Sequence, residues 1–216
     1  RTTPCIANVR PSGIYAVDDL HFAGGVPQLF KQLESLVHKE CLNVNGQTLG
    51  EILEHVKDAP NDVIRTVNNP ICKDGGLSIL KGNLAPNGSV IRSSTIKESM
   101  QHFRGTAKVY SSDSEAHKAI INEEVKPGDV VVVRYVGPVG APGMVEIMEA
   151  TEAIVNLGLD ESVSLITDGR FSGFCHGPII GHVSPEAANG GPIALVEDGD
   201  IIEIDIPNRS LKLEVS

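Results

Sequence analysis

Apolar residues recur along the first two-thirds of the chain in two patterns, which predict alternating helices and strands. Spacings of three and four positions are typical of an amphipathic helix, whereas short apolar runs are typical of strands. The predicted helices are Gly25 to about His38, a segment opened by Thr48-Leu-Gly-Glu51, a segment opened by Ser112-Asp-Ser-Glu115, and Met144 to Asn156. The predicted strands are Val63–Thr66, Leu77–Leu80, Ser89–Arg92, Lys108–Tyr110, Val130–Tyr135 and Val163–Ile166.

The last quarter of the chain changes to an alternation of period two. This pattern predicts strands at Ile193–Val196, Ile201–Ile206 and Leu211–Val215, with Asp198-Gly199 as a hairpin turn between the first two. Because Val130–Tyr135 is apolar on both faces, we expect it at the centre of a sheet. Many strands with a few covering helices predict a barrel-like α/β domain with mixed sheets.

The domain prediction follows from where the strands lie. Residues 1–60 contain few strands, so we expect a helical connector or edge segment there, and we assign the barrel-like domain to residues 61–216. The chain starts at Arg1 without Met or a basic, apolar leader, which predicts a processed protein or an excised fragment.

Composition restricts the partners. Of the 216 residues 41% are apolar and none is Trp, so Val, Ile and Leu must fill the core. A net charge of -10 argues against a nucleic-acid or anionic-membrane partner. The four cysteines, at Cys5, Cys41, Cys72 and Cys175, lack metal-type spacing, so reduced intracellular thiols are favoured.

The segment from Leu165 to Ala187 is the strongest candidate for chemistry. A short apolar strand leads into a loop in which glycines and prolines separate polar side chains. Polar residues at the end of a buried strand are where α/β proteins usually place a site. The polar residues gathered there are Asp168, Arg170, Ser172, Cys175, His176 and His182.

Single residues of this segment allow more than one interpretation. Ser172 is one position away from where a hydrolase nucleophile elbow needs it, so a Ser172–His176–Asp168 triad is a less favoured alternative to a simple turn serine. Arg170 would bind a substrate carboxylate or pair with Asp168. Single histidines are more often packing or surface residues, so only the gathering of these side chains favours a site.

A second loop, Gly137-Pro-Val-Gly-Ala-Pro-Gly143, follows the central strand and ends at the predicted Met144 helix. Free amides and the helix dipole would favour an anion there. Glu146 would lie in the first turn of that helix. Its carboxylate would either complement the helix dipole or bind a hard cation in a cleft between two strand-end loops. Neither glycine loop matches a nucleotide-binding fingerprint.

Longer motifs extend over nearly the whole chain. They are Arg10-Pro-Ser-Gly13, Gly75-Gly-Leu-Ser-Ile-Leu-Lys-Gly-Asn-Leu-Ala-Pro86, Gly128-Asp-Val-Val-Val-Val-Arg-Tyr-Val-Gly-Pro138, Ala141-Pro-Gly-Met-Val-Glu-Ile-Met148, Ile166-Thr-Asp-Gly-Arg-Phe-Ser-Gly173, Gly181-His-Val-Ser-Pro-Glu-Ala187 and Gly190-Gly-Pro-Ile-Ala-Leu-Val196. Together they resemble the C-terminal domain of the dihydroxy-acid dehydratase / phosphogluconate dehydratase family. The resemblance implies a swivelling β/β/α barrel, which agrees with the strand-rich pattern.

The resemblance also implies a reaction. Family members dehydrate 2,3-dihydroxy acids or sugar acids to 2-keto acids, using Mg²⁺ and an iron–sulfur cluster. By resemblance, Glu146 matches the glutamate that this domain contributes to the Mg²⁺ site, and Ser172 matches the serine proposed as general base. A serine is too weak a base at neutral pH on its own, so that role requires a nearby cation.

The implied cofactors need residues that this sequence lacks. The resemblance places the cluster cysteines, and the remaining Mg²⁺ ligands, in an N-terminal domain, in motifs around Cys-Asp-Lys and Cys-Gly-Gly-Met that do not occur here. We therefore expect a piece of a larger homo-oligomeric enzyme, inactive alone, whose partners are the missing N-terminal domain and a small dihydroxy acid. The implied compartment is the bacterial cytosol, or a mitochondrial or plastid matrix.

Substrate choice is predicted from one departure. Relatives usually carry small or hydroxyl residues after Ser172-Gly173, where this chain has Phe174-Cys175-His176. We expect these residues and Arg170 to bind substrate, with Phe174 either narrowing the pocket toward short branched dihydroxy acids or facing away. A dihydroxy acid of branched-chain amino-acid biosynthesis is favoured, and a sugar acid is the alternative. A noncatalytic binding or swivel module would be favoured if Glu146 and Ser172 lay far apart.

Overall fold

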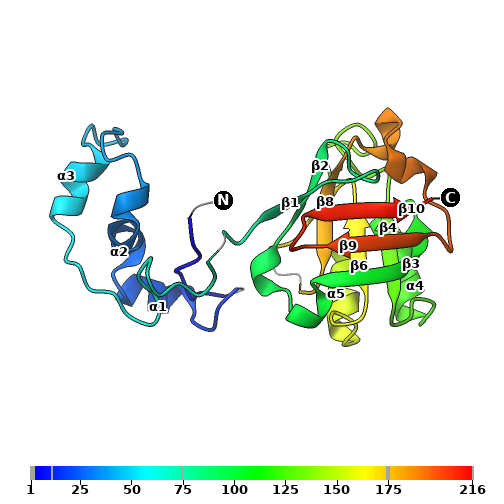
Figure 1. Ribbon diagram of the computed structural model, residues 1–216, viewed down its shortest axis with the longest axis horizontal. Helices are drawn as coiled ribbons and strands as arrows, with labels where there is room; N and C mark the ends of the chain where they lie inside the picture. The colour runs from blue at the N-terminus through cyan, green and yellow to red at the C-terminus, as the bar shows by residue number, and fades with distance from the viewer. Residues whose placement is uncertain (1–2, 11, 74, 174–175, 216) are drawn as a thin grey trace. The chain divides into compact units, whose positions relative to one another are not determined.

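The structure is a computed structural model, which describes residues 3–10, 12–73, 75–173 and 176–215. Its contacts divide the chain into two compact units, Arg1–Gly76 and Leu77–Ser216 (Figure 1). The first unit is helical with isolated β-bridges, and the second is built on a large sheet. No helix in the described part of the chain is long and apolar enough to cross a membrane.

The described residues of the first unit form three short α-helices. They are α1 (Val17–Phe22), α2 (Gly25–Gln32) and α3 (Leu49–Glu54), with a 3-10 turn η1 (Glu34–Leu36). The capping box predicted at Thr48 is confirmed, because its hydroxyl accepts the Glu51 N–H at 3.2 Å and the Glu51 carboxylate accepts the Thr48 N–H at 2.7 Å. The strand predicted at Val63–Thr66 is wrong, since only an isolated bridge joins Ile64 to Ala7.

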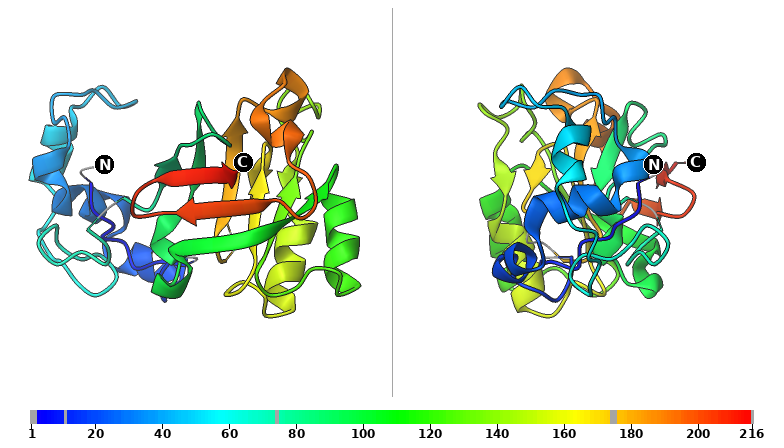
Figure 2. Two further views of the ribbon diagram at one scale, coloured as in Figure 1. Left: turned by 45° about the vertical axis from the view of Figure 1, so that its right-hand side comes forward. Right: turned by 90° about the vertical axis from the view of Figure 1, so that its left-hand side faces the viewer.

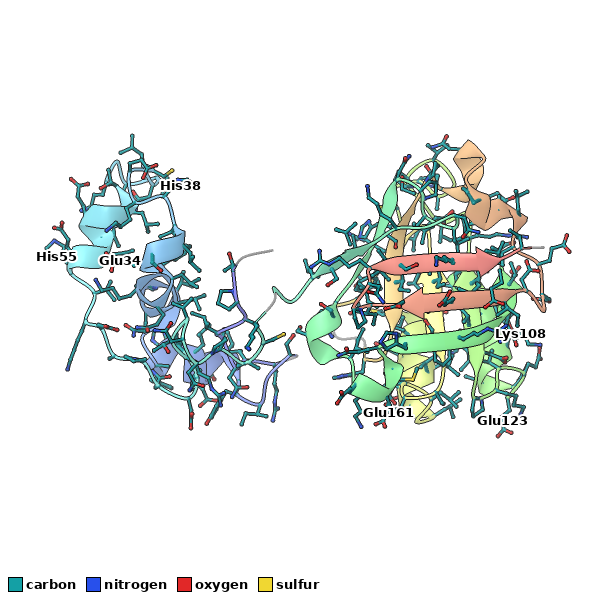
Figure 3. The ribbon with its side chains drawn as sticks, viewed as in Figure 1. Glu34, His38, His55, Lys108, Glu123 and Glu161 are labelled. Carbon is teal, nitrogen blue, oxygen red and sulfur yellow. The ribbon has the colours of Figure 1, made fainter. Side chains whose placement is uncertain are left out.

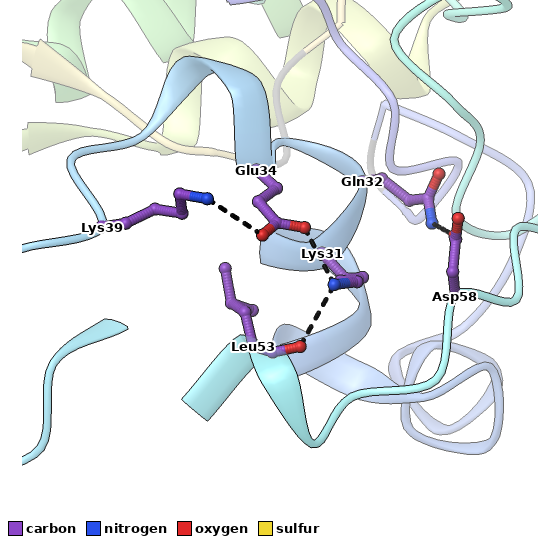
Figure 4. A network of polar contacts seen from close by, with 6 residues as sticks. All are labelled: Lys31, Gln32, Glu34, Lys39, Leu53 and Asp58. Carbon is purple, nitrogen blue, oxygen red and sulfur yellow. Dashed lines mark hydrogen bonds and ion pairs between the residues drawn. The ribbon is translucent and has the colours of Figure 1, made fainter. Parts of the chain in front are cut away.

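A polar network joins α2 to α3 in this unit (Figure 4). Lys31 Nζ donates to the Leu53 carbonyl at 3.2 Å and pairs with Glu34 at 2.9 Å. Hydrogen bonds from Lys31 and then Lys39 hold the pKa of the Glu34 carboxyl below its usual range. Gln32 donates to Asp58 at 2.6 Å. These polar contacts link α2 to α3 and to the loop that follows α3.

The apolar stripe predicted for Gly25 to His38 is largely exposed within this unit. The α-helix ends at Gln32, and it buries Gln28 and Gln32 while Val26 stays 54% and Phe30 36% exposed. An amphipathic helix normally buries its apolar face. The first unit thus leaves apolar surface of α2 uncovered.

The second unit is organised around a mixed sheet. Its eight strands follow the order β1-β2-β8-β6-β4-β3-β9-β10, and β3, β4, β6 and β8 run parallel. The strands are β1 (Ser78–Leu80), β2 (Gly88–Ile91), β3 (His102–Tyr110), β4 (Asp129–Val133), β6 (Ser164–Thr167), β8 (Ile179–Ser184), β9 (Ile201–Asp205) and β10 (Ser210–Glu214). A separate ribbon pairs β5 (Glu146–Ile147) with β7 (Arg170–Phe171).

The two edges of the large sheet meet and nearly close it. Lys81, just after β1, forms a parallel bridge with Ser210 of β10. Asn83 extends the contact, because its side-chain amide donates to the Leu213 carbonyl at 2.7 Å and accepts the Leu213 N–H at 2.8 Å. A Cβ on Gly82 would lie 1.8 Å from the Leu211 carbonyl oxygen, so this approach requires glycine. The predicted barrel-like α/β fold is confirmed.

Strand β4 lies between two apolar cores. All five of its residues are buried; Val130 and Val132 face one core, and Val131 and Val133 face the other. The second core lies under α4 (Asp113–Ile121) and α5 (Glu149–Asn156), which cover one face of the sheet (Figure 2). The central position predicted for this strand from its apolar run is confirmed.

The last quarter corrects two predictions. Ile193–Val196 is not a strand but belongs to a 3-10 turn, η5 (Pro192–Leu195), and Asp198-Gly199 leads from it into β9. Pro192 has no N–H for a strand ladder, and Arg134 donates to the carbonyls of Ala194 at 2.6 Å and Val196 at 2.8 Å. The hairpin instead joins β9 to β10. The other 3-10 turns are η2 (Ser93–Thr95), η3 (Glu98–Met100) and η4 (Ala187–Asn189).

Candidate functional site

The β5–β7 ribbon carries the candidate catalytic residues. Glu146 pairs with Arg170 and Ile147 with Phe171 in a parallel register. Ile147 is fully buried and Phe171 packs on the same core, so Glu146 and Arg170 occupy the opposite face of the ribbon. By the same alternation, the next position on that face is Ser172, which directly follows β7. The two strand-end loops therefore bring Glu146 and the Ser172 segment side by side.

Glu146 does not lie in a helix. The prediction that a helix starts at Met144 is wrong, because α5 begins at Glu149 and Glu146 belongs to β5. Its side chain cannot then complement the dipole of the first helical turn. Glu146 is half-buried, and within the described residues its carboxylate has no hydrogen-bond or ion-pair partner. A half-buried, uncompensated carboxylate suits a cation ligand.

The amino terminus of α5 is occupied by another carboxylate. Asp113, the first residue of α4, accepts the N–H groups of Met148 and Glu149 at 3.0 Å each and of Ala150 at 2.9 Å. Such amides are the groups that would otherwise attract an external anion. The predicted anion site at the start of this helix is therefore filled from within the chain.

The Gly137–Gly143 loop is likewise satisfied internally. The buried Glu186 carboxylate accepts the N–H of Val139 at 3.0 Å and of Gly140 at 3.1 Å, together with the Asn189 side-chain amide at 3.0 Å. A Cβ on Gly137 would lie 2.2 Å from a Glu186 oxygen, so glycine permits the close approach. The prediction that these amides hold an anionic ligand is corrected: they hold Glu186.

Asp168 ties three segments together. Its side chain is 1% exposed, and it accepts the N–H groups of Tyr135 at 3.1 Å, Val136 at 3.0 Å and Ala187 at 2.9 Å. These amides follow β4 and β8, whereas Asp168 follows β6. Asp168 is thus a structural carboxylate that fixes the carboxyl ends of three parallel strands.

His176 lies away from Asp168. It is exposed and lines a small hollow with Asp160 and Glu161, in the loop that precedes β6. Figure 3 labels Glu161, which precedes β6, and Glu123, which precedes β4. Because β4 and β6 are parallel neighbours, both loops lie at the amino ends of these strands. His176 is therefore near the amino ends of the parallel strands, and the Ser172–His176–Asp168 triad is not assembled among the described residues.

The remaining predicted substrate residues have different outcomes. Arg170 is exposed, and among the residues that the structure describes it forms no ion pair with Asp168. Its side chain is on the same ribbon face as Glu146, where it is available to a ligand carboxylate. Phe174 and Cys175 lie outside the described residues, so their predicted contacts with substrate stay predictions.

A cleft of about 430 Å³ with both polar and apolar walls lies at the carboxyl ends of β6 and β8. His182 enters it from β8 with a positive φ of 55°, which is unusual for a residue with a side chain. Met144, two residues before Glu146, lines the same cleft and also has a positive φ, of 52°. Asn87, Ser184 and Asn189 supply further polar groups. His182 and Ser184 belong to the Leu165–Ala187 segment that the sequence indicates, whereas Asn87 and Met144 are brought to it only by the fold.

Metal binding by this chain alone is restricted. Within the described ranges no group of three or more His, Cys, Asp or Glu side chains is arranged to hold a metal ion. Glu146 fits as one ligand, which requires further ligands from elsewhere. The cysteines Cys5, Cys41 and Cys72 are free and lie in the first unit. Burial, and then the neighbouring Cys72, raises the pKa of the Cys5 thiol, so it is a poor thiolate donor.

Comparison with known proteins gives a consistent result along the whole chain. Residues 62–216 match the family described as dihydroxy-acid/6-phosphogluconate dehydratase C-terminal, and residues 1–52 match its N-terminal counterpart. The motif Arg10-Pro-Ser-Gly13 thus falls in the N-terminal match, a correction to its predicted place in the C-terminal domain. The predicted domain boundary near residue 60 stays a prediction.

Similar proteins are named dihydroxy-acid dehydratase. The chain is 54% identical over 216 residues to the protein of Archaeoglobus fulgidus, 52% over 220 residues to that of Ignicoccus hospitalis and 49% over 218 residues to that of Halothermothrix orenii. Each match covers 100% of this chain but only 39 to 40% of the relative. The chain therefore spans about two-fifths of the length of these relatives, and it belongs to the dihydroxy-acid/6-phosphogluconate dehydratase family.

Proposed function

We propose that the full-length protein carrying this chain dehydrates a 2,3-dihydroxy acid to a 2-keto acid, and that Glu146 and Ser172 are this chain's contribution to the reaction. The observation that carries the proposal is the pairing of β5 with β7, which puts Glu146 opposite Arg170 and next to the Ser172 segment. Relatives about half identical over the whole chain are named for this activity. A short branched substrate, as in branched-chain amino-acid biosynthesis, is the first choice.

Each residue has one task in this proposal. Ser172 takes the proton from carbon 2, the C–H electron pair forms a double bond to carbon 3 as the carbon 3 hydroxyl leaves and ends as water, and the resulting enol tautomerises to the 2-keto acid. The exposed Arg170 guanidinium orients the substrate carboxylate. Glu146 holds one side of a Mg²⁺ ion, for which its half-buried carboxylate, unpaired among the described residues, is suited. When bound, a divalent cation supplies Lewis-acid stabilisation of the charge that develops on the substrate.

An iron–sulfur cluster does not fit the residues of this chain. The free cysteines that the structure describes belong to the first unit, and no metal-type group forms among the described side chains. We therefore assign the cluster, and the remaining Mg²⁺ ligands, to the rest of the full-length protein. No step by the residues of this chain is derived through the cluster.

The rest of the protein is also the proposed partner of the first unit. Residues 1–52 match an N-terminal domain family, and the exposed Val26 and Phe30 side chains of α2 need an apolar neighbour. We propose that the preceding part of that domain covers them, and that the full enzyme is a homo-oligomer. A cytosolic compartment, or a mitochondrial or plastid matrix, remains a prediction.

The substrate class is tested with the full-length protein, purified without oxygen and supplied with Mg²⁺. We expect turnover of 2,3-dihydroxyisovalerate, measured as 2-keto acid formed, with a kcat/KM at least about tenfold above that for aldonic acids, because one extra polar group can be rejected by about that factor or more. Higher activity on aldonic acids would favour the sugar-acid alternative. No activity on any of these acids would favour a noncatalytic module.

The metal role of Glu146 predicts a change in metal affinity. Glu146→Gln keeps the size of the side chain but removes its charge, so the Mg²⁺ concentration for half-maximal activity is expected to rise about 10- to 100-fold. Titration of activity with Mg²⁺ in the full-length protein measures this shift. The matched control is Glu149→Gln, an exposed glutamate in the first turn of α5. Equal Mg²⁺ titrations for both variants would contradict the assignment.

A further inference from the structure

An arginine from a distant segment contacts the candidate base loop. Arg92 follows β2, and its guanidinium Nη1 donates to the carbonyl of Gly173, 81 residues further along the chain. Gly173 is the residue after Ser172. A guanidinium bond to a carbonyl is charge-assisted and stronger than an ordinary amide bond. The backbone is therefore anchored by Arg92 one residue after Ser172, at the Gly173 carbonyl.

The origin of Arg92 in the barrel makes it a fixed anchor. Its neighbour Ile91 is fully buried and pairs with Ile180 of β8 and with Ser78 of β1. The arginine itself is half-buried at the end of that strand. Its side chain thus extends from a rigid part of the sheet rather than from a loop that moves with Ser172.

Gly173 is a point at which the backbone needs such an anchor. It is exposed, and a Cβ built on it would meet nothing within 4 Å among the described residues. Glycine also loses more conformational freedom on ordering than any other residue. On the other side of Ser172, the β7–β5 pairing fixes Phe171 against Ile147. Ser172 therefore lies between a strand pairing and the Arg92 contact.

We infer that Arg92 is a positioning residue, which fixes Ser172 relative to Glu146 by holding the Gly173 carbonyl. The inference rests on the proposed function, because it assigns Arg92 a role through Ser172. Reactive groups must be placed to within a fraction of an ångström, and a displacement of about 1 Å costs on the order of 10²-fold in rate. Loss of the Arg92 contact should therefore lower kcat while leaving substrate binding nearly unchanged.

The test compares Arg92→Met and Arg92→Lys in the full-length protein. Methionine keeps much of the length of the side chain without a donor, so kcat is expected to fall about 10- to 100-fold with KM changed by less than about threefold. Lysine retains a cationic donor, and most of the lost kcat should return. The matched control is Arg104→Met, which removes an arginine whose partner is Glu214 on the β3–β10 side of the barrel, at 2.7 Å. That variant should keep its activity.

A second readout separates positioning from general damage. If Arg92 acts through Ser172, Arg92→Met should cost little in single-turnover rate once Ser172 is already alanine, whereas a merely structural loss would persist in that background. Two results would overturn this inference and leave the proposed function standing. One is an equally large loss of single-turnover rate when Arg92→Met is added to Ser172→Ala, and the other is an unchanged kcat in Arg92→Met. Normal turnover of Ser172→Ala overturns the proposed function and this inference with it. If Arg92→Met does not fold, the kcat of Arg92→Lys against Arg92→Gln decides in the same way.

Discussion

Ser172→Ala in the full-length protein is expected to lose about 10²- to 10⁴-fold in kcat, the usual contribution of a positioned general acid or base. The hydroxyl is the only group that the substitution removes. Because Ser172 directly follows β7, whose register with β5 is set by backbone pairing and by the buried Ile147 side chain, the change should leave the ribbon intact. Steady-state assays on the dihydroxy acid give the rate, and Mg²⁺ titration shows whether the metal still binds.

The control for this prediction is a second serine-to-alanine variant, which measures the general effect of losing a serine hydroxyl. Ser162 lies in the loop before β6 and donates only to the nearby Leu159 carbonyl, at 3.3 Å, among the contacts of its hydroxyl within the described residues. Ser162→Ala should keep normal turnover. Near-normal kcat in Ser172→Ala, with metal and cluster bound, would refute the assignment of the base.

Asp168→Ala should cost about 3–5 kcal/mol of stability, the largest loss that we expect outside the apolar core. The substitution leaves the Tyr135, Val136 and Ala187 amides without their acceptor, and each unsatisfied buried donor costs roughly 1–3 kcal/mol. For a domain of about 150 residues, 1 kcal/mol corresponds to a shift of about 2–4 °C, so the unfolding midpoint should fall by roughly 10 °C. Thermal denaturation of the full-length protein, followed by circular dichroism, measures it.

Asp198→Ala is the control for this prediction. Asp198 is exposed and accepts one N–H, from Val109 at 2.7 Å, so its loss should cost about 1 kcal/mol or less. Equal falls in the unfolding midpoint for the two variants would contradict the prediction that the three buried hydrogen bonds of Asp168 stabilise the fold more than the single bond of Asp198. Activity of Asp168→Ala below its midpoint should also fall, because the loops that carry Glu146 and Ser172 lose a shared anchor.

Strand and helix predictions succeeded where local pattern and tertiary packing agree. The valine run of β4 is apolar on both faces and is buried on both. The capping box at Thr48 formed because its donors and acceptors lie three residues apart. The strand predicted at Ile193–Val196 is wrong, because a 3-10 turn starts at Pro192 and Arg134 binds the carbonyls of Ala194 and Val196. The helix predicted from Gly25 did form as α2, but its apolar side chains stay exposed. The spacing of apolar residues predicts a helix without showing which part of the protein covers its apolar face.

The candidate site was predictable in its residues but not in its arrangement. Motif resemblance selected Glu146 and Ser172 from sequence, and the family is confirmed. It did not predict that Glu146 lies in a strand paired with Arg170. The amides that looked ready for an anion are filled by Glu186 and Asp113, which lie 46 and 37 residues away from amides that they bind.

By itself, the sequence determined the family, most of the helices and strands, and the two loops that we propose for the chemistry, because these depend on short motifs and on the spacing of apolar residues. Only the tertiary structure decided which carboxylates are structural and which is left for a ligand. Asp168, Glu186 and Asp113 each bind backbone amides from another segment, whereas Glu146 has no partner within the described residues. The physical reason is that a carboxylate's role depends on which donors surround it in space, and those donors come from residues far away along the chain.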